Sequence, residues 1–204
     1  MPDIESRLRD AVEALPMGLR DHVLRVEAEA VRLADRHGVD RERARIAVLG
    51  HDLLRHKTAP ELLALAAVHG LQPDAVEQTA PVLIHGPLAA RILQSAYGMT
   101  DADVLAAIDC HTTARAGMST LEKVLFVADK IEPEKVERNP SWREVRELSE
   151  IDPSTGSGHG LDRALLRWLD LHLEEAVRRG WLLHPRSVEA RNQLLATMTE
   201  AAAG

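Results

Sequence analysis

Apolar residues recur at three- and four-residue spacing along most of this chain, a pattern that constrains it to fold mainly as α-helices. Val26, Ala30 and Leu33 show the spacing, and Gly38 follows where a helix end is expected. Helix-capping residues precede several of the other apolar runs. The predicted helices cover residues 1–16, 19–37, a segment capped by Asp40, 62–69, 73–83, a segment with Pro87 in its first turn and His85 just before it, one capped at residues 100–103, one capped at Ser119, 161–179 and 187–199.

The rarity of aromatic side chains supports the same fold class. Aromatic residues make up 2% of the 204 residues, so the core has to be built from Leu, Val, Ile and Ala, which favours helices packed on helices. The chain is long enough for one domain with a substantial core, spanning 1–204. Residues 152–160, rich in Gly and Ser, are expected to form a flexible surface loop. The charge-rich stretch 132–150 is expected to form a solvated helix face.

Charge and cysteine content exclude several classes of protein. The chain has 25 Lys and Arg against 32 Asp and Glu, a net charge of −7, which argues against general nucleic-acid binding. A local basic pocket for a phosphorylated small molecule remains compatible with that balance. Cys110 is the single cysteine, so an internal disulfide and a multi-cysteine zinc site are excluded. Because the sequence shows neither a signal peptide nor a membrane-length apolar run, a cytoplasmic protein without a membrane partner is expected.

The pair His51-Asp52 ends an apolar run, residues 44–49, that is typical of a buried helix. A segment whose only task is packing has no reason to end in two polar groups. Ionisable residues are seldom fully buried unless they are paired or bound to a metal ion. We therefore interpret His51-Asp52 as the centre of a metal site whose other ligands come from elsewhere in the chain.

Six ionisable side chains fall on inward-facing positions or at helix ends, and together they indicate a metal centre. Imidazoles and carboxylates without a thiolate suit iron, manganese, zinc and similar ions. Six ligands exceed the needs of one tetrahedral site and would serve two metal ions, with Asp52 placed to bridge them. Paired metal ions activate a shared water for in-line displacement at phosphorus, which is the chemistry that this set of residues indicates. The six are His22, His51, Asp52, His85, His111 and Asp129.

Each of these residues also has a purely structural explanation when it is taken alone. An imidazolium at a helix end interacts favourably with the helix dipole, which would explain His51. His22 and His111 would be hydrogen-bonded core histidines, and His85 a loop histidine beside Gly-Pro. Asp129 would pair with a nearby Lys or Arg. All of these explanations would have to hold at once for residues that all face inward, so the metal centre is the simpler interpretation.

The motifs around these residues resemble those of HD-domain metal-dependent phosphohydrolases and, more narrowly, those of the bacterial YqeK family. The sequence HTTARAGMS at 111–119, followed by VADKIEP at 127–133, carries the most specific part of the resemblance, which covers most of the chain. The resemblance implies an all-α HD-domain helical bundle with two divalent metal ions, usually iron, with manganese, zinc, cobalt and nickel as alternatives. It implies symmetrical hydrolysis of diadenosine tetraphosphate to two ADP, so that the partner is a small nucleotide. A homodimer is an open alternative to a monomer.

The same resemblance assigns roles to individual residues. One metal ion would be held by His22, His51, Asp52 and Asp129, and the other by Asp52, His85 and His111. A hydroxide bridging the metals is expected to attack an inner phosphorus, with Asp52 and Arg55 as the catalytic residues. Substrate contacts are expected from Arg55, Thr112, Thr113, Arg115 and Lys130. Residues 55, 114, 116, 130 and 135 depart from the family pattern, which leaves the ligand set complete but bears on substrate preference.

Two other functions remain open at the level of sequence. A different HD phosphohydrolase would act on nucleoside mono- or diphosphates or on a cyclic dinucleotide. A non-catalytic metal or nucleotide sensor would use the same pocket only for binding, although a complete ligand set with basic neighbours argues against it.

Overall fold

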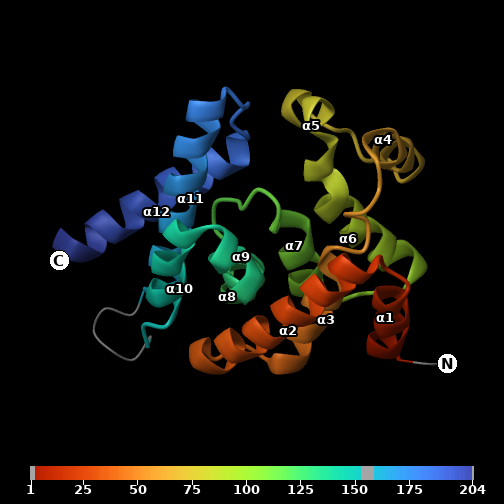
Figure 1. Ribbon diagram of the computed structural model, residues 1–204, viewed down its shortest axis with the longest axis horizontal. Helices are drawn as coiled ribbons and strands as arrows, with labels where there is room; N and C mark the ends of the chain where they lie inside the picture. The colour runs from red at the N-terminus through yellow and green to blue at the C-terminus, as the bar shows by residue number, and fades with distance from the viewer. Residues whose placement is uncertain (1–2, 153–158, 204) are drawn as a thin grey trace.

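All regular structure in residues 3–152 and 159–203, the part of the chain that the computed structural model describes, is helical, which confirms the predicted all-α class (Figure 1). The helices are α1 (Ile4–Glu13), α2 (Met17–His37), α3 (Arg41–His51), α4 (Ala59–Val68), α5 (Ala75–Thr79), η1 (Pro81–Ile84), α6 (His85–Ala96), α7 (Ala102–Cys110), α8 (Thr120–Ile131), α9 (Pro133–Arg138), η2 (Pro140–Trp142), α10 (Arg143–Ser149), α11 (Gly160–Arg179) and α12 (Pro185–Ala203). Of the predicted flexible loop at 152–160, residues 153–158 lie outside the described residues.

Local sequence signals fix most helix ends. Asp40 caps α3 by accepting a hydrogen bond from the Arg43 backbone N–H at 2.8 Å, and Ser119 forms a capping box with Glu122 at the start of α8. Gly38 ends α2 in the left-handed conformation, with φ of 67°, as the sequence predicted. Losing one such N-terminal cap typically costs about 1 kcal/mol of stability.

Three of the predicted boundaries are wrong. The single helix expected over 73–83 is split into α5 and η1, because Pro81 has no N–H to continue the α-helical hydrogen bonds. His85, which was expected just before the N-terminus of the next helix, is the first residue of α6, while Pro87 lies in the first turn as predicted, where the backbone N–H groups have no partner in the helix. The stretch 132–150 forms α9, η2 and α10 rather than one solvated helix, and Glu132 is buried at its start.

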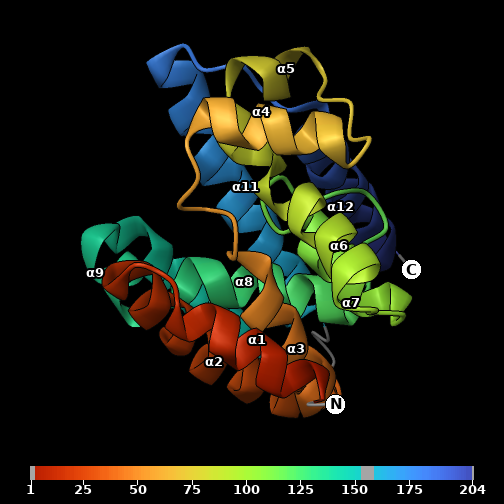
Figure 2. The ribbon, with the colours of Figure 1, turned by 90° about the vertical axis from the view of Figure 1, so that its right-hand side faces the viewer.

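Helix α8 forms the centre of the core. All of its residues from Leu121 to Ile131 are buried except the partly exposed Lys123, and the helix packs against α2, α7 and α11 (Figure 2). Phe126 is fully buried and meets the Trp168 ring of α11 edge to face, with 5.0 Å between the ring centroids. Burial of one such large side chain contributes about 1.5–3 kcal/mol. Asp129, near the end of this helix, is therefore held on a rigid scaffold.

A second, smaller apolar cluster joins α4, η1 and α6. Its buried members are Leu62, Ala66, Ile84 and Leu88. This cluster fixes the start of α6, and with it His85, beside the main core. None of the helices in the described ranges is both long and apolar enough to cross a membrane.

Candidate metal centre

The six predicted ligands converge on one buried place although they come from five separate parts of the chain. His51 is the last residue of α3 and Asp52 its C-cap, while His111 is the C-cap of α7. His85 opens α6, and the remaining two residues lie within α2 and α8. Each of the six side chains is buried, and His51 is 0% exposed. The six side chains therefore lie together in the interior, as the sequence predicted.

Asp52 lies in the middle of the group and turns its two oxygens toward different imidazoles. Its Oδ1 is 2.9 Å from His85 Nε2 and 3.4 Å from His111 Nε2. Its Oδ2 is 3.5 Å from His22 Nε2 and 3.6 Å from His51 Nε2. Two faces of one carboxylate are thus each presented to a pair of nitrogen atoms, which is the arrangement expected of a bridging ligand.

Asp129 completes the side of the site that faces α2 and α8. Its Oδ1 is 3.0 Å from His22 Nε2 and 3.9 Å from His51 Nε2. Ligand atoms of two triplets lie within 4.8 Å of one another and could hold a metal ion. The triplets are His22 with His51 and Asp129, and His51 with Asp52 and His111.

Backbone carbonyl groups fix the tautomer of three of these imidazoles. Nδ1 of His51 donates to the Val48 carbonyl at 2.5 Å, and Nδ1 of His111 donates to the Ile108 carbonyl at 2.8 Å. Nδ1 of His85 donates in the same way to the carbonyl of Val82. A carbonyl oxygen can only accept, so each Nδ1 carries the hydrogen and each neutral ring presents an Nε2 lone pair.

Those lone pairs face other acceptors, and a cation would resolve the conflict. His85 Nε2 lies 3.0 Å from His111 Nε2 and 2.9 Å from Asp52 Oδ1. His51 Nε2 is buried and has no hydrogen-bond partner among the described residues. Buried polar atoms almost always have a hydrogen-bond partner, and a bound ion accounts for acceptors that face no donor. The residues present therefore fit divalent metal ions, and the donor set of nitrogen and oxygen atoms suits several of them.

Electrostatics put His51, Asp52 and Asp129 in the protonation states that metal binding requires. Burial lowers the pKa of His51 to about 3, so its ring is neutral near pH 7. Burial by itself would raise the pKa of Asp52, but His51, His111 and His85 hold it well below the usual carboxyl value. The pKa of Asp129 is also well below the usual carboxyl value, because the charges of Lys130 and Lys135 outweigh the effect of burial. Its carboxyl group is therefore ionised.

Two glycines let the surrounding helices approach the site. A Cβ atom on Gly86 would lie 2.7 Å from the carbonyl oxygen of Ile108 and 2.9 Å from the His111 ring. A Cβ atom on Gly50 would lie 2.6 Å from Leu93 Cδ1. All three distances are below normal contact, so close packing of α3, α6 and α7 depends on the absence of a side chain at Gly50 and Gly86.

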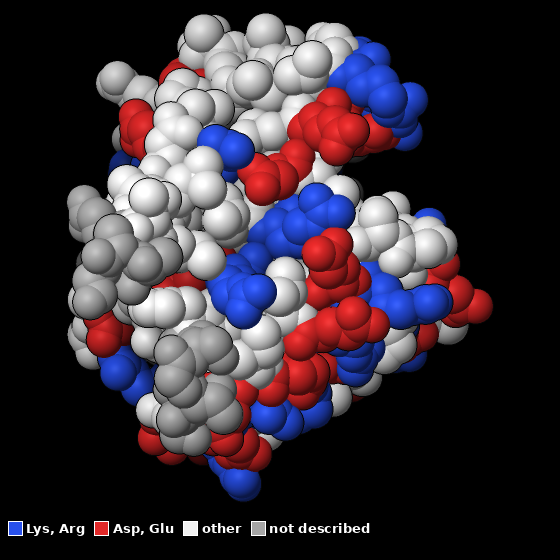
Figure 3. All heavy atoms as spheres, turned by 90° about the vertical axis from the view of Figure 1, so that its left-hand side faces the viewer, with Lys and Arg blue, Asp and Glu red and all other residues white. Residues whose placement is uncertain are grey.

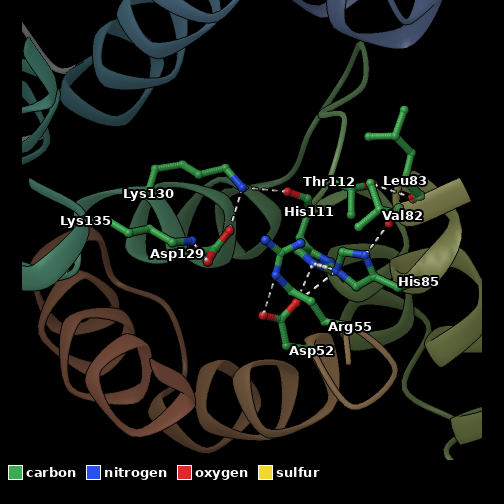
Figure 4. A pocket seen from close by; sticks show the side chains of 10 residues that line it. All are labelled: Asp52, Arg55, Val82, Leu83, His85, His111, Thr112, Asp129, Lys130 and Lys135. Carbon is green, nitrogen blue, oxygen red and sulfur yellow. Dashed lines mark hydrogen bonds and ion pairs between the residues drawn. The ribbon is translucent and has the colours of Figure 1, made fainter. Parts of the chain in front are cut away.

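A small cavity of about 110 Å³ opens in front of the carboxylates and is bordered by three cationic side chains (Figure 4). Nζ of Lys130 and Nζ of Lys135 each lie 2.5 Å from an oxygen of Asp129. Arg55 lies across the cavity, 46% exposed, with Nε 3.6 Å from Asp52 Oδ2. On the face drawn in Figure 3, a hollow opens at the edge of the molecule and Lys and Arg side chains lie beside it. The cavity therefore combines metal-binding groups with positive charge.

The predicted substrate-contact residues divide into two sets. Arg55, Thr112 and Lys130 line this cavity. Thr113 is buried behind it with its hydroxyl donating to the Ala114 carbonyl, and it lines a neighbouring cavity instead. Arg115 does not join them, because its Nε donates to the buried Glu122 carboxylate at 2.6 Å.

Sequence reasoning left two residues of the site without a role. Lys135 lies in α9, which begins at Pro133, so its ion pair with Asp129 depends on the orientation of α9 relative to α8. Glu132 is buried, lies 3.4 Å from His22 Nδ1 and accepts from Arg25 Nε at 2.7 Å. Its position three residues after Asp129, one helical turn away, is a signal that could have marked it as part of the site.

A sequence model of the HD domain family matches residues 19–134, a range that contains all six candidate ligands. The chain belongs to the HD domain family. It is 37% identical over 131 residues to a Bacillus subtilis protein named bis(5'-nucleosyl)-tetraphosphatase, symmetrical, a match that covers 64% of this chain and 69% of the relative. A Staphylococcus aureus protein of the same name is 33% identical over 147 residues, covering 72% of this chain and 74% of that relative.

A solved structure supports the fold. It is described as a predicted HD superfamily hydrolase involved in NAD metabolism from Clostridium acetobutylicum, and it superposes with a TM-score of 0.84 at 31% sequence identity. The superposition covers 94% of this chain and 97% of the other, so the helices outside residues 19–134 are shared as well.

Proposed function

We propose that this protein is a metal-dependent phosphohydrolase that cleaves diadenosine tetraphosphate symmetrically into two ADP. The observation that carries the proposal is the cluster of buried imidazole nitrogens and carboxylate oxygens that face one another without donors between them, opening into a cation-lined cavity. The substrate is inferred from the relatives, whose names specify a symmetrical tetraphosphatase.

Two divalent metal ions are assigned to this cluster. His22, His51, Asp52 and Asp129 would hold one, and Asp52, His85 and His111 the other, with iron as the expected metal. When bound, such a pair supplies a hydroxide nucleophile and polarises the phosphoryl oxygens. The division of Asp52 oxygens between two imidazole pairs supports its role as the ligand shared by both positions.

The remaining residues of the cavity bind and neutralise the polyphosphate. Arg55, Lys130 and Lys135 place three cationic side chains around a small volume, which attracts a chain of phosphates and offsets charge that develops on the leaving oxygen. Arg55 presents a planar fork that can donate twice to one phosphate, and its partial exposure leaves it free to do so. Lys130 is 9% exposed, and its Nζ donates to the Asp129 carboxylate and to the His111 carbonyl, which hold the ammonium group at the cavity.

The test is turnover of diadenosine tetraphosphate by protein purified without oxygen and supplied with ferrous ion, with products separated by chromatography. ADP as the sole nucleotide product is the expected result. A different product would support an HD phosphohydrolase of another nucleotide, and binding without turnover would support a sensor. The Asp52→Ala variant should lose both turnover and bound metal, whereas Asp10→Ala, on the exposed face of α1, should keep both.

A further inference from the structure

A second, larger cavity of about 460 Å³ lies beside the candidate metal centre. It opens between α5 and η1 on one side and the end of α11 with its connection to α12 on the other, segments that face each other in Figure 1. Its volume is within the range of about 300–1,000 Å³ that is usual for small-molecule sites. Its lining includes Val76, Thr79, Val82, Thr112, Trp181 and Leu182.

The two cavities share a wall. Val82, Leu83 and Thr112 line both of them. The hydroxyl of Thr112 donates to the Leu83 carbonyl at 3.0 Å, which fixes the position of that wall. On the far side, the hydroxyl of Ser187 donates to the Thr113 carbonyl at 2.7 Å and ties the start of α12 to the same loop. The two cavities are therefore adjacent, so one extended ligand that passes Thr112 would reach both.

The two cavities differ sharply in chemistry. The metal cavity is bordered by Arg55, Lys130 and Lys135, whereas the second contains no Lys, Arg, Asp or Glu among its lining residues and has only the imidazoles of His172 and His184 as titratable groups. Trp181 and Leu182 border it while remaining 50% and 57% exposed. The Arg179 guanidinium lies over the Trp181 ring, 5.0 Å from its centroid, so a base would stack on the other face of the indole. A charged compartment that adjoins an apolar, aromatic one matches a nucleotide, whose phosphates and base differ in the same way.

We propose that the second cavity holds the nucleoside of one half of the substrate, with its base against Trp181; this inference rests on the proposed function. The base is held by apolar contact and by stacking on the indole, while its phosphates extend past Thr112 toward the carboxylates. Trp181 is then a substrate-binding residue that acts on affinity and leaves the chemical step alone.

The first test uses a substitution at an exposed position to fill part of the cavity. Thr79 lines the cavity and lies on the surface of α5, so Thr79→Trp should fill it without disturbing the core. Gln78→Trp, at the adjacent position outside the cavity, is the matched control. With the metal-loaded enzyme, Thr79→Trp should weaken ADP binding in calorimetry and raise KM for diadenosine tetraphosphate, each by about tenfold, within what base stacking on an aromatic contributes. The value of kcat and the affinity for inorganic tripolyphosphate should stay at the wild-type level, as should every property of Gln78→Trp.

A second pair of variants removes contact rather than adding bulk. Trp181→Ala should weaken ADP binding by a similar factor, and the quenching of tryptophan fluorescence by ADP should disappear with it. Val177→Ala, an exposed residue of the same helix end that does not line the cavity, is the control. Wild-type affinity for ADP in both Thr79→Trp and Trp181→Ala would overturn the inference.

The outcome separates this inference from the proposed function. If the wild-type protein fails to cleave diadenosine tetraphosphate but Thr79→Trp still loses ADP, the function is wrong and the nucleoside cavity stands. If the wild-type protein cleaves it and neither variant alters KM, the function stands and the cavity assignment is wrong.

Discussion

Substitution of Gly86 by Ala sets two well-understood effects against each other. Gly86 lies in the first turn of α6, and replacing a helical Gly by Ala usually stabilises by about 0.5–1 kcal/mol. The added Cβ, however, would lie 2.7 Å from the Ile108 carbonyl oxygen and 2.9 Å from His111 Cε1 and Nδ1. Those are the acceptor and donor of the 2.8 Å hydrogen bond that orients His111, so the methyl group would wedge against both.

The structure indicates that the clash outweighs the gain in helix propensity. The carbonyl belongs to the backbone of α7 and cannot rotate away, and overpacking of this kind costs about 1–3 kcal/mol. The net expectation is a loss of about 1–2 kcal/mol, which for a chain of this length corresponds to a fall in Tm of about 2–8 °C. Because the methyl group also displaces the His111 ring, bound metal should fall together with stability.

Thermal unfolding and elemental analysis of the purified variant measure both effects. Gly18→Ala is the matched control, because Gly18 is also in the first turn of a helix, and a Cβ atom added there would meet no other atom within 4 Å. Gly18→Ala should keep its metal and be as stable as the wild type or more so. A Gly86→Ala protein with unchanged Tm and full metal content would refute the reasoning about His111.

Three further predictions follow from contacts elsewhere in the molecule. Chelation should lower Tm, and ferrous or manganous ion should restore it, because a ligand that binds only the folded state stabilises it; an unchanged Tm would argue against a metal centre. Asp101→Asn keeps the cap of α7 but loses the ion pair with Arg43, which, together with the cap hydrogen bonds, holds the pKa of Asp101 below its usual value. A carboxyl pKa lowered by folding stabilises above the unfolded pKa and loses that contribution as the pH falls, so the variant should be less stable by up to about 1 kcal/mol near pH 7 and equal to wild type in acid. Cys110 is buried, and burial together with Glu122 raises the pKa of its thiol, so iodoacetamide should modify it only in unfolded protein; rapid labelling under native conditions would contradict the packing around α7.

Much of the candidate site could be predicted because its signals are local. The apolar spacing of α8 places Asp129 on the same face as Leu121 and Leu125, and all three are buried. The caps at Asp40 and Ser119 fix where their helices begin. Such signals depend only on neighbours within a turn or two, so a single sequence contains them.

What could not be predicted depends on contacts between distant segments. Arg115 was expected at the substrate because it lies in a specific motif, but its guanidinium is hydrogen-bonded to Glu122. The sequence predicts only the capping role of Glu122 and not this second contact. The second cavity is formed by α5 with the α11–α12 connection, which are about a hundred residues apart, so Trp181 has no local signal that distinguishes it from a packing residue.

The orientations of the four histidine rings divide into those set by local contacts and one set by a distant contact. His51, His85 and His111 each donate through Nδ1 to a carbonyl three residues earlier, a spacing of one helical turn. Once each histidine is placed at the end or start of a helical segment, the freedom of its Nε2 therefore follows from local geometry alone. His22 differs, because its Nδ1 faces Glu132, 110 residues away. The orientation of three imidazoles is encoded by their own helical turns, whereas that of the fourth depends on the packing of α2 against the end of α8, so Glu132→Gln should affect His22 and leave the other three rings in place.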